Sequence, residues 1–152
     1  MNVIREAKKS GLSITCDTAP PYFSLNESKL LTYNTAFKLS PPLRSEDDRL
    51  AIIEGIQDGT IDAIASDHRA RSKDTKAQPF SAASVGASGI ETLFSITLDL
   101  VHKKIIDINK AISFLTINPA KIFGIGSPSL EEEKVADFIV FDENEPHTIK
   151  QE

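Results

Sequence analysis

Stretches with the apolar spacing of helices alternate along this chain with short runs typical of strands. Helical spacing, together with start and stop residues, predicts six helices. Their ranges are 2–9, 27–31, 46–58, 90–103, 107–115 and 118–122. Short apolar or alternating runs predict strands at 12–16, 60–65 and 135–142. The tail from Glu143 is polar, and we expect it to be frayed.

The order of these elements favours an α/β fold. Helices separate the predicted strands, which is typical of strands that pair in parallel. The run 60–65 is largely apolar, as expected of a strand that is buried on both faces. Two parallel strands by themselves form a marginal sheet whose edges stay open. We therefore expect the chain to self-associate or to dissolve poorly when it is expressed alone.

Local signals mark the ends of the longer predicted helices. Ser45 precedes three acidic residues, a pattern typical of an N-cap and a first turn that the helix dipole stabilises. Gly59 ends the same helix, and Asp107 is the expected cap of the helix at 107–115. The range 67–88 is a long polar loop, of a length that is usually functional or disordered.

Composition narrows the classes of protein that fit this chain. Its 152 residues suggest one domain, and 40% hydrophobic with 26% charged residues is ordinary for a globular protein. A net charge of −5, with lysines and arginines scattered along the sequence, argues against nucleic acid or an anionic membrane as partner. No apolar run approaches the ~20 residues of a membrane span. A single cysteine, Cys16, excludes an intrachain disulfide, and we predict a cytoplasmic protein without a secretory signal.

The candidate chemistry lies at Asp67 and His68, directly after the strand predicted at 60–65. A carboxylate and a histidine at the carboxyl end of a buried strand are where an α/β-barrel hydrolase places a metal ligand or a proton-transfer group. The alternative is a turn or capping carboxylate with no chemical role. A chain of 152 residues is too short for a whole barrel of this kind.

The other residues that could bind metal are poorly placed in the sequence. A catalytic zinc needs about three converging protein ligands. His102 is expected to cap a helix end or to face solvent, and His147 lies in the polar tail. Cys16 sits in a predicted strand and is expected to be a small core residue. Only Asp67 and His68 are placed as a site would be.

Several motifs, in order along nearly the whole chain, resemble the dihydroorotase branch of the cyclic amidohydrolases. The segments that carry the resemblance are Cys-Asp-Thr-Ala-Pro-Pro-Tyr at 16–22, Lys-Leu-Ser-Pro-Pro-Leu-Arg at 38–44, Asp-Gly-Thr-Ile-Asp-Ala-Ile-Ala-Ser-Asp-His at 58–68, Pro-Phe at 79–80, Gly86, Gly-Ile-Glu-Thr at 89–92, Asn-Pro-Ala at 118–120 and Ala-Asp at 136–137. The match is far more specific than any single motif.

The resemblance implies a particular fold. Residues 1–126 would be the C-terminal portion of a TIM-type (β/α)8 barrel, with the runs 12–16 and 60–66 as about its strands seven and eight. Residues 127–152 would be a terminal β segment and tail, whose strand at 135–142 belongs to a small β domain. The implied reaction is the reversible cyclisation of carbamoyl aspartate to dihydroorotate in pyrimidine biosynthesis, in which a metal-bound hydroxide attacks the ring amide.

The resemblance also implies roles for particular residues. Asp67 matches the aspartate that ligates the metal, zinc in this family, and moves the proton. Ser40, Arg71, Val85 and Gly86 match the substrate contacts. Serine stands at position 40 where many members have asparagine, and arginine stands at position 71 where many have histidine. A guanidinium can still bind a substrate carboxylate.

Four functions stay open from the sequence. The family's other metal ligands match positions before residue 1, and Asp67 alone cannot hold zinc. We therefore expect a truncated dihydroorotase-like enzyme that is inactive alone. A common His-His is replaced at 21–22 by Pro-Tyr, as in divergent members, so a non-catalytic partner of aspartate carbamoyltransferase is an alternative. The third possibility is a gene remnant with no function of its own. The fourth is an allantoinase or a related cyclic amidase.

Overall fold

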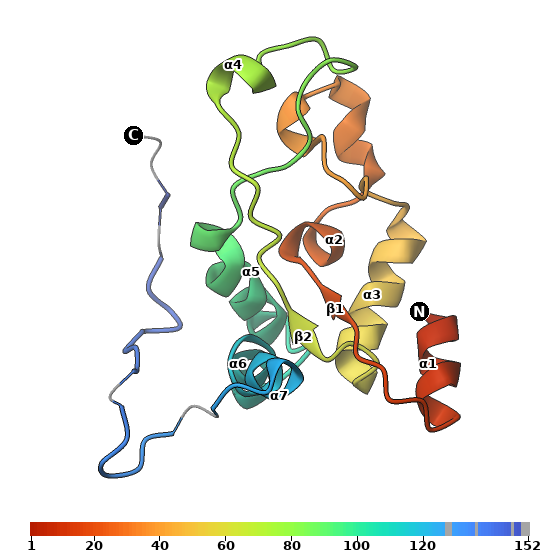
Figure 1. Ribbon diagram of the computed structural model, residues 1–152. Coiled ribbons are helices and arrows are strands. Elements are labelled where there is room, and N and C mark those ends of the chain that lie inside the picture. Colours follow the sequence, from red (N-terminus) through yellow and green to blue (C-terminus); the bar gives the residue numbers. More distant parts are fainter. Residues whose placement is uncertain (127–128, 136, 147, 150–152) are drawn as a thin grey trace.

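Two short parallel strands lie at the centre of the protein (Figure 1). The structure, a computed structural model, describes residues 1–126, 129–135, 137–146 and 148–149. Strand β1 (Asp17–Thr18) pairs with β2 (Ala63–Ile64), with Asp17 opposite Ala63 and Thr18 opposite Ile64. The predicted parallel pairing is confirmed.

The crossover between the two strands is mostly helical. It contains α2 (Pro20–Ser24), the 3-10 helices η1 (Glu27–Thr32) and η2 (Thr35–Phe37), and α3 (Glu46–Asp58). The predicted ends of α3 are confirmed: the Ser45 hydroxyl accepts a 3.2 Å bond from the Asp48 N–H, and Gly59 follows with φ of 80°. Helix α2 was not expected, because two prolines end a strand more often than they begin a helix. Pro20 suits the first helical position, where its missing N–H costs nothing.

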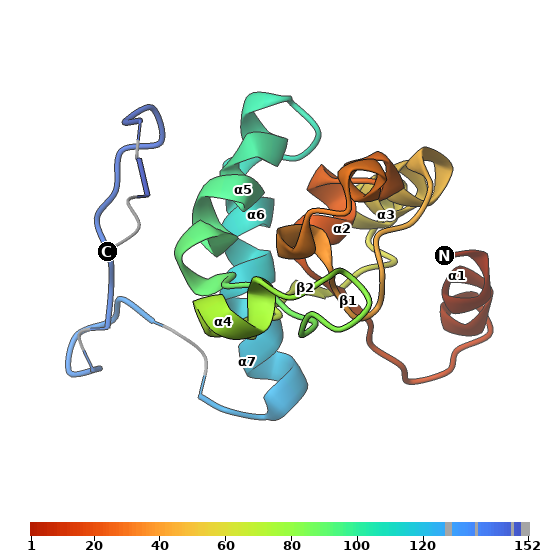
Figure 2. The same cartoon turned by 90° about the horizontal axis from the view of Figure 1, so that it is seen from above.

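Further helices follow β2 and precede β1. The chain continues through α4 (Lys73–Lys76), α5 (Ile90–His102), α6 (Ile108–Leu115) and α7 (Ile117–Phe123), while α1 (Asn2–Lys9) begins it. In Figure 2 the strands lie between α2 and α3 on one side and α5, α6 and α7 on the other. The Asp107 carboxylate accepts a 2.8 Å bond from the Lys110 N–H, which confirms the predicted cap of α6.

The core lies where both groups of helices meet β2. Side chains from the strand region, from four helices and from the link between α5 and α6 form one buried cluster, which comprises Phe23, Ile56, Ile61, Ile64, Leu100, Ile106, Ala111 and Phe114. Because the sheet is narrow, helix–helix contacts supply most of this apolar packing.

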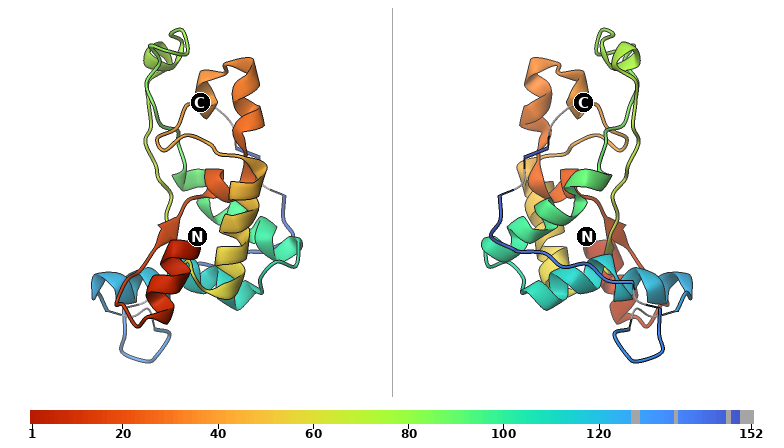
Figure 3. Two further views of the ribbon diagram at one scale, coloured as in Figure 1. Left: turned by 90° about the vertical axis from the view of Figure 1, so that its right-hand side faces the viewer. Right: turned by 90° about the vertical axis from the view of Figure 1, so that its left-hand side faces the viewer.

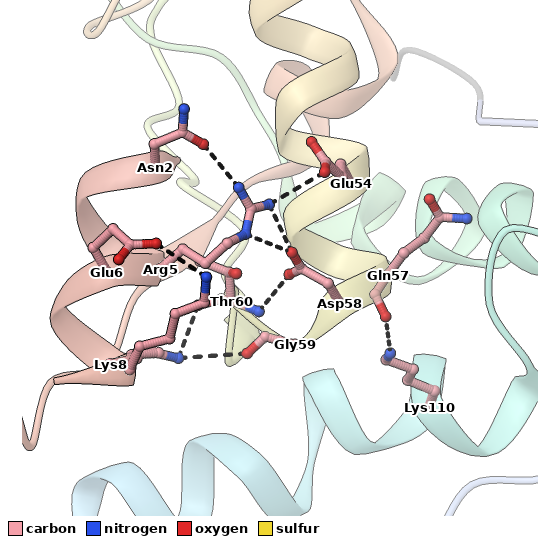
Figure 4. Close-up of polar contacts among 11 residues, drawn as sticks. Asn2, Arg5, Glu6, Lys8, Glu54, Gln57, Asp58, Gly59, Thr60 and Lys110 are labelled. Carbon is pink, nitrogen blue, oxygen red and sulfur yellow. Dashed lines mark hydrogen bonds and ion pairs between the residues drawn. The ribbon is translucent and has the colours of Figure 1, made fainter. Parts of the chain in front are cut away.

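Polar contacts hold α1 against the end of α3 (Figure 4). The Arg5 guanidinium donates a 2.7 Å bond to Asp58, and the Lys8 ammonium donates a 2.8 Å bond to the Thr60 carbonyl. Helix α1 contains no buried residue. Charge pairing therefore attaches this helix to the rest of the chain more than apolar packing does.

The first predicted strand is displaced in the structure. The range 12–16 contains no assigned strand, and Leu12 is 59% exposed. Pairing with the second strand begins only where the Asp62 N–H bonds the Cys16 carbonyl at 2.8 Å. The second predicted strand, 60–65, shrinks to Ala63–Ile64 for the same reason, because a strand is assigned only where it has a partner.

The prediction of a strand at 135–142 is wrong for the residues that the structure describes there, 135 and 137–142. None of these is assigned to a strand, and Val140 is 90% exposed. The alternating apolar residues that predicted it have no neighbouring strand in the described part of the chain. Phe141 packs its ring edge-on against Phe94 of α5 instead, with the ring centroids 4.7 Å apart.

The loop segments that carry η1, η2 and α4 lie together at one end of the molecule (Figure 3).

Within the described residues, no helix has both the length and the apolar character that a membrane crossing needs. The division of the chain at residue 126 stays a prediction.

Candidate functional site

Asp67 lies at the carboxyl end of β2, where the chain turns into the long loop. Its φ of 45° puts it in the left-handed region, which Asp tolerates better than most residues. Its side chain is 27% exposed, and one carboxylate oxygen lies 3.3 Å from Nε of Arg69. The carboxylate is therefore accessible and already has one cationic neighbour.

Asp67 shares a cleft of about 450 Å³ with Ser40, which arrives from the crossover segment. Tyr22 of α2, Arg44 and Arg69 also line this cleft. The structure thus brings together two of the residues that the sequence analysis singled out, 27 positions apart in the chain.

Tyr22 is a residue of this cleft whose place the sequence pattern did not indicate. Its hydroxyl donates a 3.0 Å bond to the Pro41 carbonyl. Burial raises the pKa of the Tyr22 phenol, and the negative charge of Asp67 raises it further. Tyr22 therefore stays a neutral hydrogen-bond donor in the cleft. No local signal in the sequence indicates this neighbour, because Asp67 lies 45 positions further along the chain.

His68 has a structural partner in this arrangement. Its Nδ1 accepts bonds from the N–H groups of Gly89, at 3.2 Å, and Ile90, at 3.3 Å. These are the first N–H groups of α5, whose N-cap Gly89 has no side chain to satisfy them. The imidazole thus caps α5, which ties the end of β2 to the helix that follows the long loop.

Arg71, Val85 and Gly86 lie together in the long loop. Nε of Arg71 donates a 2.9 Å bond to the Val85 carbonyl. The Gly86 N–H donates a 3.0 Å bond to the Lys38 carbonyl, and Gly86 has φ of 115°. A Cβ at Gly86 would lie 2.7 Å from Cβ of Arg69, so this close approach requires glycine. These three residues are not among those that line the Asp67 cleft.

The described residues do not complete a metal site. No group of three or more His, Cys, Asp or Glu side chains that could hold a metal ion occurs among them. His102 lies at the far end of α5, where Nε2 is 3.0 Å from the Glu143 carbonyl. Cys16 is half-buried, and burial raises the pKa of its thiol. His147 lies outside the described residues.

Comparison of the sequence with known proteins gives close relatives. A family model described as "Amidohydrolase family" matches residues 2–151. A dihydroorotase of Anaplasma phagocytophilum is 40% identical over 142 residues, which are 93% of this chain and 32% of that protein. A dihydroorotase of Thermoanaerobacter sp. is 41% identical over 150 residues, 98% of this chain and 35% of that protein. The chain thus spans about a third of the length of the curated relatives it matches.

Comparison of the structure with solved structures points the same way. An L-hydantoinase (dihydropyrimidinase) from Arthrobacter aurescens superposes with a TM-score of 0.75 and 26% identity, over 81% of this chain and 28% of that one. A dihydropyrimidinase from Brevibacillus agri gives a TM-score of 0.75 at 24% identity, over 82% of this chain and 29% of that one. At 24% identity, the likeness to the Brevibacillus agri protein bears on the fold alone. The predicted α/β class is confirmed.

Proposed function

Because this chain belongs to the amidohydrolase family, we propose that it supplies the Asp67 side of a dihydroorotase-type active site. The reaction is the interconversion of carbamoyl aspartate and dihydroorotate. The observation that supports the proposal most is the position of Asp67, whose accessible carboxylate ends β2 and shares a cleft with Ser40. The dihydroorotase relatives, about 40% identical over nearly the whole chain, favour this reaction within the family.

In this proposal Asp67 accepts and returns the proton of the ring amide, and it is one ligand of a zinc ion. A lone carboxylate paired with Arg69 does not fit a complete zinc centre. We therefore assign no step to the metal. Ser40 would bind the substrate inside the cleft, while Arg71, Val85 and Gly86 would hold it from the loop side.

The charges near Asp67 favour an acidic substrate. Arg44 and Arg69 line the cleft, and each has one carboxylate neighbour, Asp48 at 3.7 Å and Asp67 at 3.3 Å. In the long loop outside the cleft, the two terminal nitrogens of Arg71 have no bond to the described residues. Guanidinium groups bind carboxylates in a bidentate geometry. Dihydroorotate carries a carboxylate and hydantoin does not, so the charge argues against a neutral cyclic amide as the main substrate.

A complementation assay tests the proposal. The full chain alone should not cyclise carbamoyl aspartate, because one carboxylate holds zinc too weakly. The partner polypeptide in the assay is the remaining two-thirds of the Anaplasma phagocytophilum dihydroorotase. Mixing the two should produce activity, which Asp67→Asn should abolish and Asp74→Asn, in the loop helix α4, should preserve.

Four outcomes of this assay would contradict the proposal or favour another function. Cyclisation by the chain alone would contradict the expected inactivity. Complementation that survives Asp67→Asn would remove Asp67 from the chemistry. If the mixture stays inactive and the chain co-elutes with aspartate carbamoyltransferase, the non-catalytic partner function replaces this proposal. Faster turnover of hydantoin than of dihydroorotate in the active mixture would favour the related cyclic amidases.

A further inference from the structure

Asp62, the residue directly before β2, contacts three other elements at once. Oδ2 of its carboxylate accepts a 2.8 Å bond from the Cys16 N–H, next to β1, and a 2.6 Å bond from the Lys8 ammonium of α1. Its own N–H donates a 2.8 Å bond to the Cys16 carbonyl, and its carbonyl accepts a 2.8 Å bond from the Asn118 side chain of α7. The proposed function gives Asp62 and Asn118 no role, although both belong to motifs that carry the family resemblance.

The Asp62 carboxylate depends on Lys8 for its charge balance. The Lys8 and Asp62 side chains are 22% and 26% exposed, so each has lost much of its contact with water. A carboxylate in such a place is costly unless it is both hydrogen-bonded and paired with a cation. Removing the ammonium would therefore leave an uncompensated negative charge beside the two strands.

Helix α1 in turn depends on its charges for its position. None of its residues is buried, and among residues 1–10 it is Met1, ahead of the helix, that packs against the buried core. The second cation of the helix, Arg5, pairs with Asp58 at 2.6 Å and with Glu54 at 3.6 Å (Figure 4). An isolated helix of eight residues is marginal in water, so α1 should unfold once its ion pairs break.

The strand pair beside Asp62 has few bonds of its own. Strands β1 and β2 have two residues each, and a two-stranded sheet of this length is marginal. At the far end of the pair the Ala65 N–H donates a 2.8 Å bond to the Thr18 carbonyl, two residues before Asp67. Because the pair is so short, losing the contact between Asp62 and Cys16 would loosen it as far as Ala65.

We propose that Lys8 and Asp62 form an ionic latch, which couples the docking of α1 to the pairing of β1 with β2. In the closed state Lys8 neutralises Asp62, whose carboxylate stays between the elements and holds the Cys16 N–H. In the open state the carboxylate turns toward water, the Cys16 N–H loses its acceptor, and α1 detaches and unfolds. The latch concerns two conformations of this chain, so it stands or falls separately from the proposed ring chemistry.

Nuclear magnetic resonance of the full chain tests the latch with one reporter for each element. The Cα chemical shift of Ala7 reports whether α1 is helical, and hydrogen exchange at the Ala65 amide reports the strand pair. Lys8→Met keeps the aliphatic stem and removes the charge. It should move the Ala7 shift to its random-coil value and speed exchange at Ala65 about tenfold. Exchange at Ala111 of α6, which is not part of the latch, should stay unchanged.

Two further variants separate the latch from a general loss of charge. Lys9→Met is the matched control, because Lys9 is 65% exposed and pairs with Glu6 inside α1 at 3.0 Å. It should leave both reporters unchanged. Asp62→Asn keeps an oxygen for the Cys16 N–H but offers no charge to Lys8. It should therefore release α1 as Lys8→Met does, yet speed exchange at Ala65 by less than about threefold.

A salt titration of the unaltered chain covers the case in which a variant does not fold. Raising sodium chloride from about 0.05 M to about 0.5 M should move the Ala7 shift toward coil and speed exchange at Ala65 in parallel, because salt screens the ion pairs. In Lys8→Met this response should vanish. The proposal is overturned if neither reporter responds to salt, if α1 unfolds while exchange at Ala65 stays slow, or if Lys9→Met acts as strongly as Lys8→Met.

Discussion

Individual residues near the site depend on local backbone geometry that tolerates few substitutions. Asp67 and Gly86 both have positive φ, at 45° and 115°. Gly86 also approaches the backbone oxygen of Arg69, which would lie 2.8 Å from an added Cβ. The loop can reach the Lys38 carbonyl only because no side chain stands at this position.

Replacing Gly86 with alanine should destabilise the protein by about 2 kcal/mol, because alanine adds both a clash and an unfavourable φ. Gly126→Ala is the control, since nothing lies within 4 Å of a Cβ there. Urea denaturation followed by circular dichroism measures the difference. Equal midpoints for the two variants would show that the loop gives way at no cost.

Glu46 makes stability depend on pH in the acidic range. Hydrogen bonds from Arg49 and Asn26 lower its pKa from 4.5 to about 2 in the folded protein. A lowered pKa means that the folded state holds the charged form better than the unfolded state does. The contribution is therefore fully present above pH 4.5 and disappears as the pH falls toward 2.

Glu46→Gln should consequently lower stability at pH 7 and make less difference at pH 2.5. Asp47→Asn, in the same turn of α3, is the matched control for the change of an acidic side chain to its amide. Denaturant midpoints at several pH values measure both. If Glu46→Gln lowers the stability by the same amount at every pH, the Arg49 side chain does not stabilise the charged form of Glu46 over the protonated form.

At the scale of elements, the helices whose caps are local in sequence were predicted well. Ser45 caps α3 and Asp107 caps α6, each through an N–H three residues later. The cap of α5 comes from His68, which is 21 residues before Gly89 in the chain. No local pattern indicates such a cap, because it exists only when β2 and α5 are already packed together.

Replacing His68 with alanine should cost about 1 kcal/mol and should speed hydrogen exchange at the Gly89 and Ile90 amides. His102→Ala, at the other end of α5, is the control. It removes a ring but leaves these two amides bonded. Exchange at Gly89 and Ile90 that is unchanged in His68→Ala would show that water replaces the imidazole without loss.

At the scale of the whole molecule, a two-stranded sheet leaves edges and apolar side chains open. Leu12, Phe123 and Ile125 are 59%, 78% and 63% exposed. Thr15, Ile64 and Phe123 border a cleft of about 250 Å³ beside the strands. Open edges and exposed apolar groups favour association with other polypeptides.

We expect the isolated chain to self-associate in a concentration-dependent way, which sedimentation velocity measures. Phe123→Ser should weaken the association about tenfold, because it removes apolar surface beside the sheet. Leu31→Ser removes a side chain that is equally exposed, at 80%, but lies in η1. It should leave the association constant unchanged. A monomer at all concentrations would contradict the prediction.

The sequence by itself determined the approximate ranges of the longer helices α1, α3, α5 and α6, the parallel pairing of the two central strands and the family. These follow from apolar periodicity, from caps that act within four residues and from motifs that are read along the chain. Tertiary structure alone decided the lengths of β1 and β2, the absence of a strand in the described part of 135–142, the cap at His68 and the meeting of Asp67 with Ser40 and Tyr22 in one cleft. Each of these needs a partner from a distant part of the chain, and no local pattern specifies that partner.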